Sequence, residues 1–517
     1  MRRTNRALRS TLAALALCSS PALASTISET AKLVATGAGP NELFGLSVDV
    51  RDALAIAGAP GTSFAGPVSG AAYLFDTESG ALIARLVASD GASGDYFGRA
   101  VTLADDVALV AATHDDDAGE SAGAVYAFDP ATGAELAKLH AGDGAAQDEF
   151  GDAIAASGKL VLIGAPGDDD NGPESGSAYL FDATTGGELH KLAPVSGLTG
   201  AHFGGAVAID TDTAVVGAMF DGQNGLGTGA AYLFDTATGE MVADLFPVGG
   251  AHNDHFGASV AIDGAYVVVG SPWNDQQGTD SGAAYVFDAV SGAQVLQLLP
   301  NDPEDGSQFG YRVAIDGTTI VVSSYLDDDY GKNSGSAYVF DATTGQQVMK
   351  LLPSDGGPGE AFGSSVAVDG NDVIVGAVLD SEHGFAAGAA YHFENHIFSF
   401  GAGCSGTAGI TPRLFMIGDP SPGAQVALVL DHGLANALSM TVIGSSDSAL
   451  GIGGCTLLVA PPHVDFHIPL GGSGSYTLPG IIPPAISPGL LYIQAFVADV
   501  GSSVGFAASN GLRAEIE

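Results

Sequence analysis

Three runs of consecutive aspartates are the residues of this sequence best suited to chemistry. They are Asp115–Asp117, Asp168–Asp170 and Asp327–Asp329, and each follows a short apolar run. Calcium prefers such hard carboxylate oxygens and takes about six to eight of them in flexible geometry. Successive residues of an extended segment point to opposite sides, so a run can chelate only if its loop turns, which Gly172 and Gly331 allow. The candidate metal ligands are Asp115, Asp117, Asp168, Asp170, Asp327 and Asp329.

Two interpretations of these runs stay open at this point. In the first, the six aspartates bind calcium, and mutual repulsion of so many carboxylates favours cation uptake. In the second, the runs are solvated, Asp-rich turns of the kind that suits saline surroundings. The formal net charge of −43 over 517 residues is compatible with both.

Aromatic residues at equivalent places in the sequence suggest a second kind of site. Trp273, the only tryptophan, matches Phe220 one repeat earlier, and Asp221, Asn274 and Asp380 fill the next position of that loop. Exposed aromatic rings among acids can stack on a sugar or anchor a protein. We therefore predict a ligand face at Trp273, Phe220, Asp221, Asn274 and Asp380, against the alternative that the rings only plug the loops.

The sequence offers no catalytic motif, and we predict no catalytic residue. It has no nucleophile elbow, phosphate-binding loop or CxxC pair. His202 and His255 share a position that other repeats fill with Leu43, Tyr96 and Glu149. The sequence therefore favours a binding protein over an enzyme.

A strict internal repeat must position these candidates. Phe-Gly recurs every 53 residues, at Phe44, Phe97, Phe150, Phe203, Phe256, Phe309 and Phe362, and a tyrosine keeps the same spacing from Tyr73 to Tyr391. Aromatic and glycine positions at such a period are typical of propellers. Each unit has four short β-like segments, shown by FGASVAID, AYVVVGSP, GAAYVFD and AQVLQLLP from Phe256 to Pro300.

The seventh unit lacks its fourth strand, and the start of the chain can supply it. TAKLVAT at Thr30 to Thr36 precedes Phe44 as ELAKLHA precedes Phe150. Closing the ring this way removes an open sheet edge. We predict an all-β protein with a seven-bladed propeller over residues 25–396, whose last blade is completed near Leu33.

The N-terminus has the plan of a secretory leader over residues 1–24, with four arginines, an apolar stretch and Ala22-Leu23-Ala24. Its removal leaves 12 basic against 59 acidic side chains, a net charge of −47. We expect an exported protein, extracellular, cell-surface or periplasmic. We expect a monomer with no membrane-spanning segment and no nucleic-acid partner, because this charge repels nucleic acid. In an exported chain Cys404 and Cys455 predict one disulfide, with two buried thiols as the alternative.

The period ends near Ile397, and residues 397–517 become rich in Gly, Pro and apolar strands such as AQVALVLD and LLYIQAFVAD. This pattern predicts a second all-β domain, a sandwich.

Taken together, Phe-Gly, an alternating strand ending in Asp-Gly, then Gly-Ala-Pro, then Gly-Ala-x-Tyr-x-Phe resembles the FG-GAP repeat of integrin α-chain propellers and exported bacterial proteins. Gly-Ala-Pro is intact only at residues 58–60 and 164–166. The calcium loop of integrin-type repeats is absent, since tight hairpins such as IDGAYVV stand in its place. The C-terminal segment resembles a domain carried by other exported bacterial proteins.

The resemblance implies an extracellular recognition or adhesion module that binds a protein or glycan through its acidic loops, with or without calcium. The rivals are an exported enzyme acting on polysaccharide, with carboxylates in the propeller funnel, and an architectural envelope protein.

Overall fold

The computed structural model describes residues 26–27, 29–35, 37–104, 106–194 and 199–394, and beyond them the backbone of strands between residues 397 and 516. The described propeller region contains strands and no helix. Accordingly, no described helix is long and apolar enough to span a membrane.

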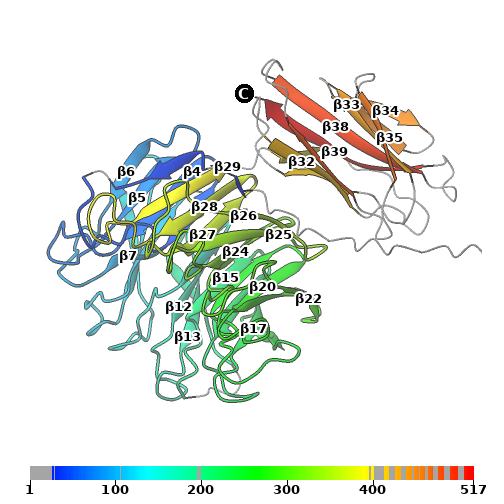
Figure 1. Cartoon of the computed structure of the whole chain (residues 1–517). Coiled ribbons are helices and arrows are strands. Elements are labelled where there is room, and N and C mark those ends of the chain that lie inside the picture. Colours follow the sequence, from blue (N-terminus) through cyan, green and yellow to red (C-terminus); the bar gives the residue numbers. More distant parts are fainter. Residues whose placement is uncertain are drawn as a thin grey trace, which may run out of the picture.

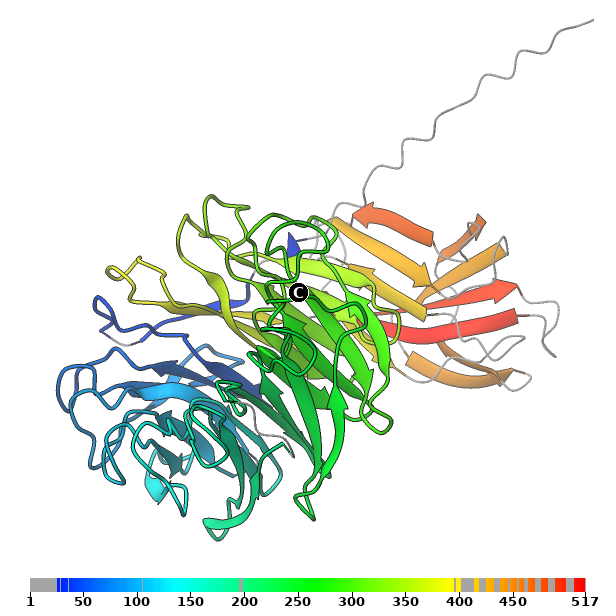
Figure 2. The same cartoon turned by 90° about the horizontal axis from the view of Figure 1, so that it is seen from below.

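Seven four-stranded antiparallel sheets form the blades of a ring, as predicted. The first strands of neighbouring blades contact one another all the way round, and β27 meets β3 to close the circle. The blue N-terminal blade accordingly lies beside the yellow seventh blade in Figures 1 and 2. The first strands are β3 (Val48–Arg51), β7 (Phe97–Leu103), β11 (Ile154–Ser157), β15 (Ala206–Asp210), β19 (Ser259–Asp263), β23 (Val313–Asp316) and β27 (Phe362–Asp369).

The other strands follow in order from the centre outward. The second strands are β4 (Leu54–Ala59), β8 (Ala108–Ala112), β12 (Leu160–Ala165), β16 (Thr213–Ala218), β20 (Tyr266–Ser271), β24 (Thr319–Ser324) and β28 (Asp372–Ala377). The third strands are β5 (Ala71–Asp76), β9 (Ala124–Phe128), β13 (Ser177–Asp182), β17 (Ala230–Asp235), β21 (Ala283–Asp288), β25 (Ser336–Asp341) and β29 (Ala389–Glu394). The fourth strands are β6 (Leu82–Leu86), β10 (Glu135–Leu139), β14 (Gly187–Leu192), β18 (Met241–Leu245), β22 (Gln294–Leu298), β26 (Gln347–Leu351) and β2 (Ala31–Leu33).

The strand β2 supplies the missing fourth strand of blade 7, which confirms the predicted closure. It pairs antiparallel with β29, with Leu33 opposite Ala390, and Leu33 is buried. The sequence did not indicate that β1 (Thr26–Ile27) would add to the outer edge of blade 6, parallel to β26.

The repeated Phe-Gly pair joins neighbouring blades. Phe256 is fully buried, its ring centroid lies 5.7 Å from those of Tyr285 and Phe287, and its backbone bridges to Gly229 of the preceding blade. Gly257 has φ +89°, and a Cβ there would lie 2.2 Å from the Ala230 oxygen. Only glycine fits so close an approach, which explains why this residue recurs after each phenylalanine.

Residues 397–516 contribute further strands in three sheets, ordered β30-β39-β38-β33-β36, β31-β32-β37 and β34-β35. They are β30 (Ile397–Phe400), β31 (Arg413–Ile417), β32 (Gln425–Asp431), β33 (Leu438–Gly444), β34 (Asp447–Ile452), β35 (Cys455–Val459), β36 (Val464–Pro469), β37 (Tyr476–Ile481), β38 (Gly489–Ala498) and β39 (Phe506–Ile516). The leader, Cys404 and the Cys455 side chain lie outside the described part, so the leader, the disulfide and the sandwich stay predictions.

Candidate functional site

All the predicted site residues of the propeller lie on one face of the ring. In an antiparallel blade, the loops between second and third strands leave on the same side as the loops between blades. We call this side the loop face, and the opposite side, with its tight hairpins, the turn face. The aspartate runs lie in the loops between β8 and β9, β12 and β13, and β24 and β25. Gly172 and Gly331 have φ +129° and +109°, so the glycines that allow these loops to turn do adopt left-handed conformations.

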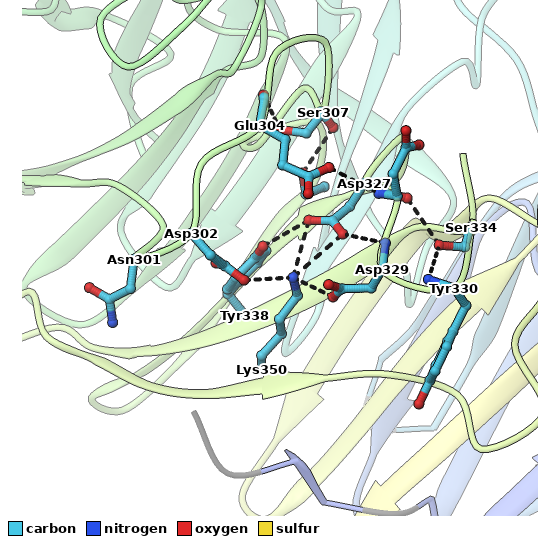
Figure 3. Close-up of polar contacts among 12 residues, drawn as sticks. Asn301, Asp302, Glu304, Ser307, Asp327, Asp329, Tyr330, Ser334, Tyr338 and Lys350 are labelled. Carbon is cyan, nitrogen blue, oxygen red and sulfur yellow. Dashed lines mark hydrogen bonds and ion pairs between the residues drawn. The ribbon is translucent and has the colours of Figure 1, made fainter. Parts of the chain in front are cut away.

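A lysine occupies the centre of the acidic group in blade 6 (Figure 3). Lys350, on β26, lies with its Nζ 2.9 Å from Asp302 Oδ2 and 3.2 Å from Asp327 Oδ2, and also contacts Asp329. Tyr338, on β25, donates its hydroxyl to Asp327 at 2.9 Å. Lys350 and Asp327 expose only 5% and 2% of their side chains. Asp327 and Asp329, which were predicted to bind a metal, are therefore brought together, but they bind the ammonium group of Lys350.

The same arrangement recurs in blades 2, 3 and 7. In blade 3, Lys191 Nζ lies 2.8, 2.9 and 2.6 Å from carboxylate oxygens of Asp143, Asp168 and Asp170. Tyr179 donates to Asp168 at 2.9 Å. The equivalent groups are Lys138 with Asp90, Asp115 and Asp117 in blade 2, and Lys32 with Asp355, Asp380 and Glu382 in blade 7. We call these four groups the lysine-centred clusters.

In blade 3 the electrostatics of the cluster stabilise the charged forms, whereas in blade 6 burial raises the pKa of Asp327. Burial lowers the pKa of Lys191, but its hydrogen bonds with Asp143 and Asp170 outweigh burial and raise the pKa above its usual value. Burial likewise raises the pKa of Asp143, and Lys191 and Tyr179 more than offset this and hold it below its usual value. Both shifts indicate a stable ion pair at neutral pH.

In the remaining three blades, a different residue stands at the position of the lysine. Blade 1 has Arg85, whose guanidinium lies 3.9 Å from the Phe64 ring centroid, and blade 5 has Gln297. Blade 4 has Asp244, and there Tyr232 donates to Asp221 at 2.6 Å. Thus only four blades build the ionic cluster.

Calcium binding at the aspartate runs stays a prediction. The lysines disfavour it, because they already occupy the space between the carboxylates. A calcium ion at Asp115, Asp168 or Asp327 would have to displace an ammonium that already contacts three carboxylates. Among the described residues, no group of three or more His, Cys, Asp and Glu side chains is arranged to hold a metal ion. The clusters were not predicted, although the sequence carries a signal for them: Lys138, Lys191 and Lys350 occupy the same position of the 53-residue repeat.

A continuous strip of aromatic rings crosses the loop face of blades 4 and 5. Ring centroids lie 5.1 Å apart for His202 and Phe220, 4.9 Å for Phe220 and His255, and 3.7 Å for His255 and Trp273. Phe220 and Trp273 expose 37% and 38% of their surface, whereas His255 is buried. Burial lowers the pKa of His255 to about 4, so its ring is neutral at pH 7. We call these four residues the aromatic strip.

The structure separates the five predicted ligand-face residues into two sets. Trp273 and Phe220 expose their rings and are joined through His255, which was not among the predicted residues. Asp221, Asn274 and Asp380 are buried. Asp221 accepts from Tyr232, Asn274 donates to Asp254, and Asp380 pairs with Lys32. These three side chains therefore bond to neighbouring groups of the protein and are not open to a ligand.

The first strands of all seven blades line a central cavity of about 580 Å³. At its turn-face end, carboxylates link one blade to the next: Asp210, Asp263 and Asp316 accept from backbone N–H groups of Gly264, Gly317 and Gly370 at 2.8, 2.6 and 3.0 Å. Asp369 accepts in the same way from Asp52 across the ring closure. Burial, with nearby Asp263 and Asp369, raises the pKa of Asp316. These four carboxylates thus link blade 4 to 5, 5 to 6, 6 to 7 and 7 to 1.

Comparison with protein-family models agrees with this architecture. A family model described as "FG-GAP repeat" matches seven times, over residues 27–75, 81–128, 134–181, 187–234, 240–287, 293–340 and 346–393. No curated protein matches the chain by sequence. Solved structures with some likeness include a europium-containing methanol dehydrogenase, at 11% identity and TM-score 0.40 over 78% of this chain and 84% of that chain. Apo AztD from Citrobacter koseri is similar at 13% identity and TM-score 0.35, over 60% and 71%.

Likeness at these scores carries no argument about function. The seven family matches, in contrast, cover more than half of the chain, and each coincides with one period of the ring. The chain belongs to the FG-GAP repeat family.

Proposed function

We propose that this protein is an exported, extracellular or cell-surface binding module that recognises a glycan or protein through the loop face of its propeller. The aromatic strip is the observation that carries the proposal. Two partly exposed rings, Phe220 and Trp273, stand on a face whose other loops are strongly acidic. Such rings give a large contact area at low entropic cost, which suits a binding hot spot.

A glycan is the favoured ligand. The His255 ring packs against both Phe220 and Trp273, so these two rings are held in position before a ligand binds. Flat, preorganised rings complement the apolar faces of sugars, and preorganisation lowers the ordering cost of binding. The lysine-centred clusters stand outside this proposal, because their lysines and buried aspartates are already paired inside each cluster.

A polysaccharide-acting enzyme is the weaker candidate. Acid–base catalysis requires carboxylates that are open to a substrate. Four of the five aspartates at the turn-face end of the central cavity accept a hydrogen bond from the neighbouring blade. That use supports a structural role for them.

The first test uses Trp273 as the only tryptophan of the chain. The mature protein is titrated with hexasaccharides of cellulose, xylan and mannan while tryptophan emission is recorded. We expect a saturable change with one of them, because a sugar over the ring alters its solvent exposure. The Phe220→Ala variant should bind that sugar at least about tenfold more weakly, since a hot-spot ring contributes about 2 kcal/mol or more.

Phe385→Ala is the matched control. Phe385 is 75% exposed in the equivalent loop of blade 7, but it lies outside the strip. Its loss should leave the affinity unchanged. Binding that persists at full strength in both Phe220→Ala and Trp273→Ala, the latter followed by calorimetry, would contradict the proposal. The absence of a saturable response to all three sugars would contradict a glycan ligand.

A further inference from the structure

The polar side chains that line the central cavity fall into two sets. One set links neighbouring blades: Ser47 accepts from Val101 N, Asp49 accepts from Thr102 and Leu103, and four aspartates act likewise at the turn-face end. The ring needs this set to hold together. At the loop-face end, Arg99 on β7 also links its blade to the next one through Asp152, whereas Arg312 contacts the cavity without such a link.

Arg312 stands out because it lacks a carboxylate partner. Arg99 pairs with Asp152 at 3.0 Å. No ion pair joins Arg312 to any carboxylate in the described part of the chain, although the protein has 59 acidic residues. The half-buried Arg312 guanidinium donates one hydrogen bond, to the Tyr311 carbonyl oxygen at 3.1 Å. Most of its five donors are thus directed to no protein acceptor.

The structure holds this guanidinium in one position. It lies 4.4 Å from the centroid of the Tyr311 ring, which stacks on Tyr325 at 4.0 Å with a tilt of 33°. The Arg312 N–H donates to Ser323 Oγ at 3.0 Å, which fixes the backbone beneath it. A stacked guanidinium loses less freedom when it binds a ligand, and its planar fork matches a carboxylate or phosphate.

The two ends of the cavity differ in charge. At the loop-face end, the charged lining residues are Arg99, Arg312 and Asp152, which give a net charge of +1. The turn-face end has one arginine among its lining residues and five aspartates: Arg51, Asp52, Asp210, Asp263, Asp316 and Asp369. Within the cavity, an anion is therefore attracted at the loop-face end and repelled further in. The volume of about 580 Å³ lies within the range of small-ligand sites, about 300 to 1,000 Å³.

We propose that the loop-face end of the central cavity is a binding site for a small oxyanion, with Arg312 as the anion-binding residue and Tyr311 and Tyr325 as positioning residues. The recognised group is a carboxylate or a phosphate of a ligand that fits the cavity. The site is separate from the aromatic strip and does not depend on the glycan proposal.

Titration calorimetry of the mature protein tests this site with galacturonate and inorganic phosphate, and with galactose as the uncharged analogue. At about 150 mM salt, where long-range repulsion is screened beyond about 8 Å, we expect saturable binding of one anion per chain and none of galactose. Stronger binding of galacturonate would identify a carboxylate ligand, and stronger binding of phosphate a phosphate ester.

Arg312→Gln should weaken anion binding by about 10- to 100-fold, as expected for loss of hydrogen bonds to a charged group. Arg85→Gln, which removes the same charge at the outer rim, should leave it unchanged. Arg312→Lys keeps the charge but lacks the planar, forked set of donors of a guanidinium, so an intermediate loss of anion affinity is expected. This variant keeps the test usable if Arg312→Gln folds poorly. No saturable binding of either anion, or equal binding by wild type and both Arg312 variants, would overturn the proposal. Phe220→Ala should bind the anion normally, which separates this result from the glycan test.

Discussion

Replacing Lys191 with methionine tests whether the lysine-centred clusters hold the blades together. Methionine preserves much of the length and apolar character of the stem but removes the ammonium. Asp168 would keep hydrogen bonds from Tyr179, Ser177 Oγ and the Asp170 N–H, at 2.9, 3.0 and 3.1 Å. It would lose its only ion-pair partner in the described structure while remaining 4% exposed.

The expected cost is about 3 kcal/mol of unfolding free energy. Removing one partner of a buried ion pair costs about 3 to 5 kcal/mol, because the other charge stays buried. The lower end applies here for two reasons. Asp168 retains three hydrogen bonds, and Asp143 and Asp170, which expose 46% and 64% of their side chains, can turn to water.

Urea unfolding followed by tryptophan emission provides the measurement. Lys159→Met is the matched control, because Lys159 is exposed on the turn face of the same blade; it should change stability by less than about 0.5 kcal/mol. The double variant Lys191→Met/Asp168→Asn should be more stable than Lys191→Met, since it no longer buries an unpaired carboxylate.

The effect of calcium on the unfolding free energy provides a second measurement on Lys191→Met. The vacated position in Lys191→Met is surrounded by three carboxylates, so calcium should raise its stability by about 1.4 kcal/mol at ten times the dissociation constant. In wild type the ammonium fills that position, and we expect no calcium-specific rise over magnesium. A loss below about 1 kcal/mol in Lys191→Met, or equal stabilisation of wild type and variant by calcium, would refute this reasoning.

Three further predictions concern the core, the ring closure and the aromatic strip. Phe256→Ala should lower the urea-derived unfolding free energy by about 3 to 5 kcal/mol, because the ring is fully buried; a loss below about 1 kcal/mol would exclude it from the core. Deleting residues 25–37 removes β2 and Lys32 and should broaden thermal unfolding and lower solubility, so unchanged melting would contradict closure by this strand. Burial lowers the pKa of His255 to about 4 from the ordinary value of 6.5, so its contribution to stability is present above pH 6.5 and falls as pH drops toward 4. His255→Gln should therefore show a flatter pH dependence of stability in this window, and an unchanged slope would show that the residue does not titrate as its burial indicates.

The ring could be predicted from the order of amino acids alone. The spacing of 53 residues, four strand-like segments in each unit and the match of Thr30–Thr36 to a missing fourth strand all follow from local pattern. Such features are visible without coordinates because each blade must bury the same faces against its neighbours. Phe256 and Gly257 recur for that packing reason, and the structure confirms both the seven blades and the closure by β2.

The roles of the conspicuous acids, in contrast, depend on the assembled fold. Lys191 lies 23 residues after Asp168 and 48 after Asp143, on a different strand, so no local window shows that the three meet. The same holds for His255 between Phe220 and Trp273, which come from separate blades. A side chain's partner depends on which loops leave the same face of the ring, and no short stretch of sequence contains that information. The sequence therefore located the acidic and aromatic residues, whereas only the folded ring distinguished those that pair internally from those that stay exposed on the loop face.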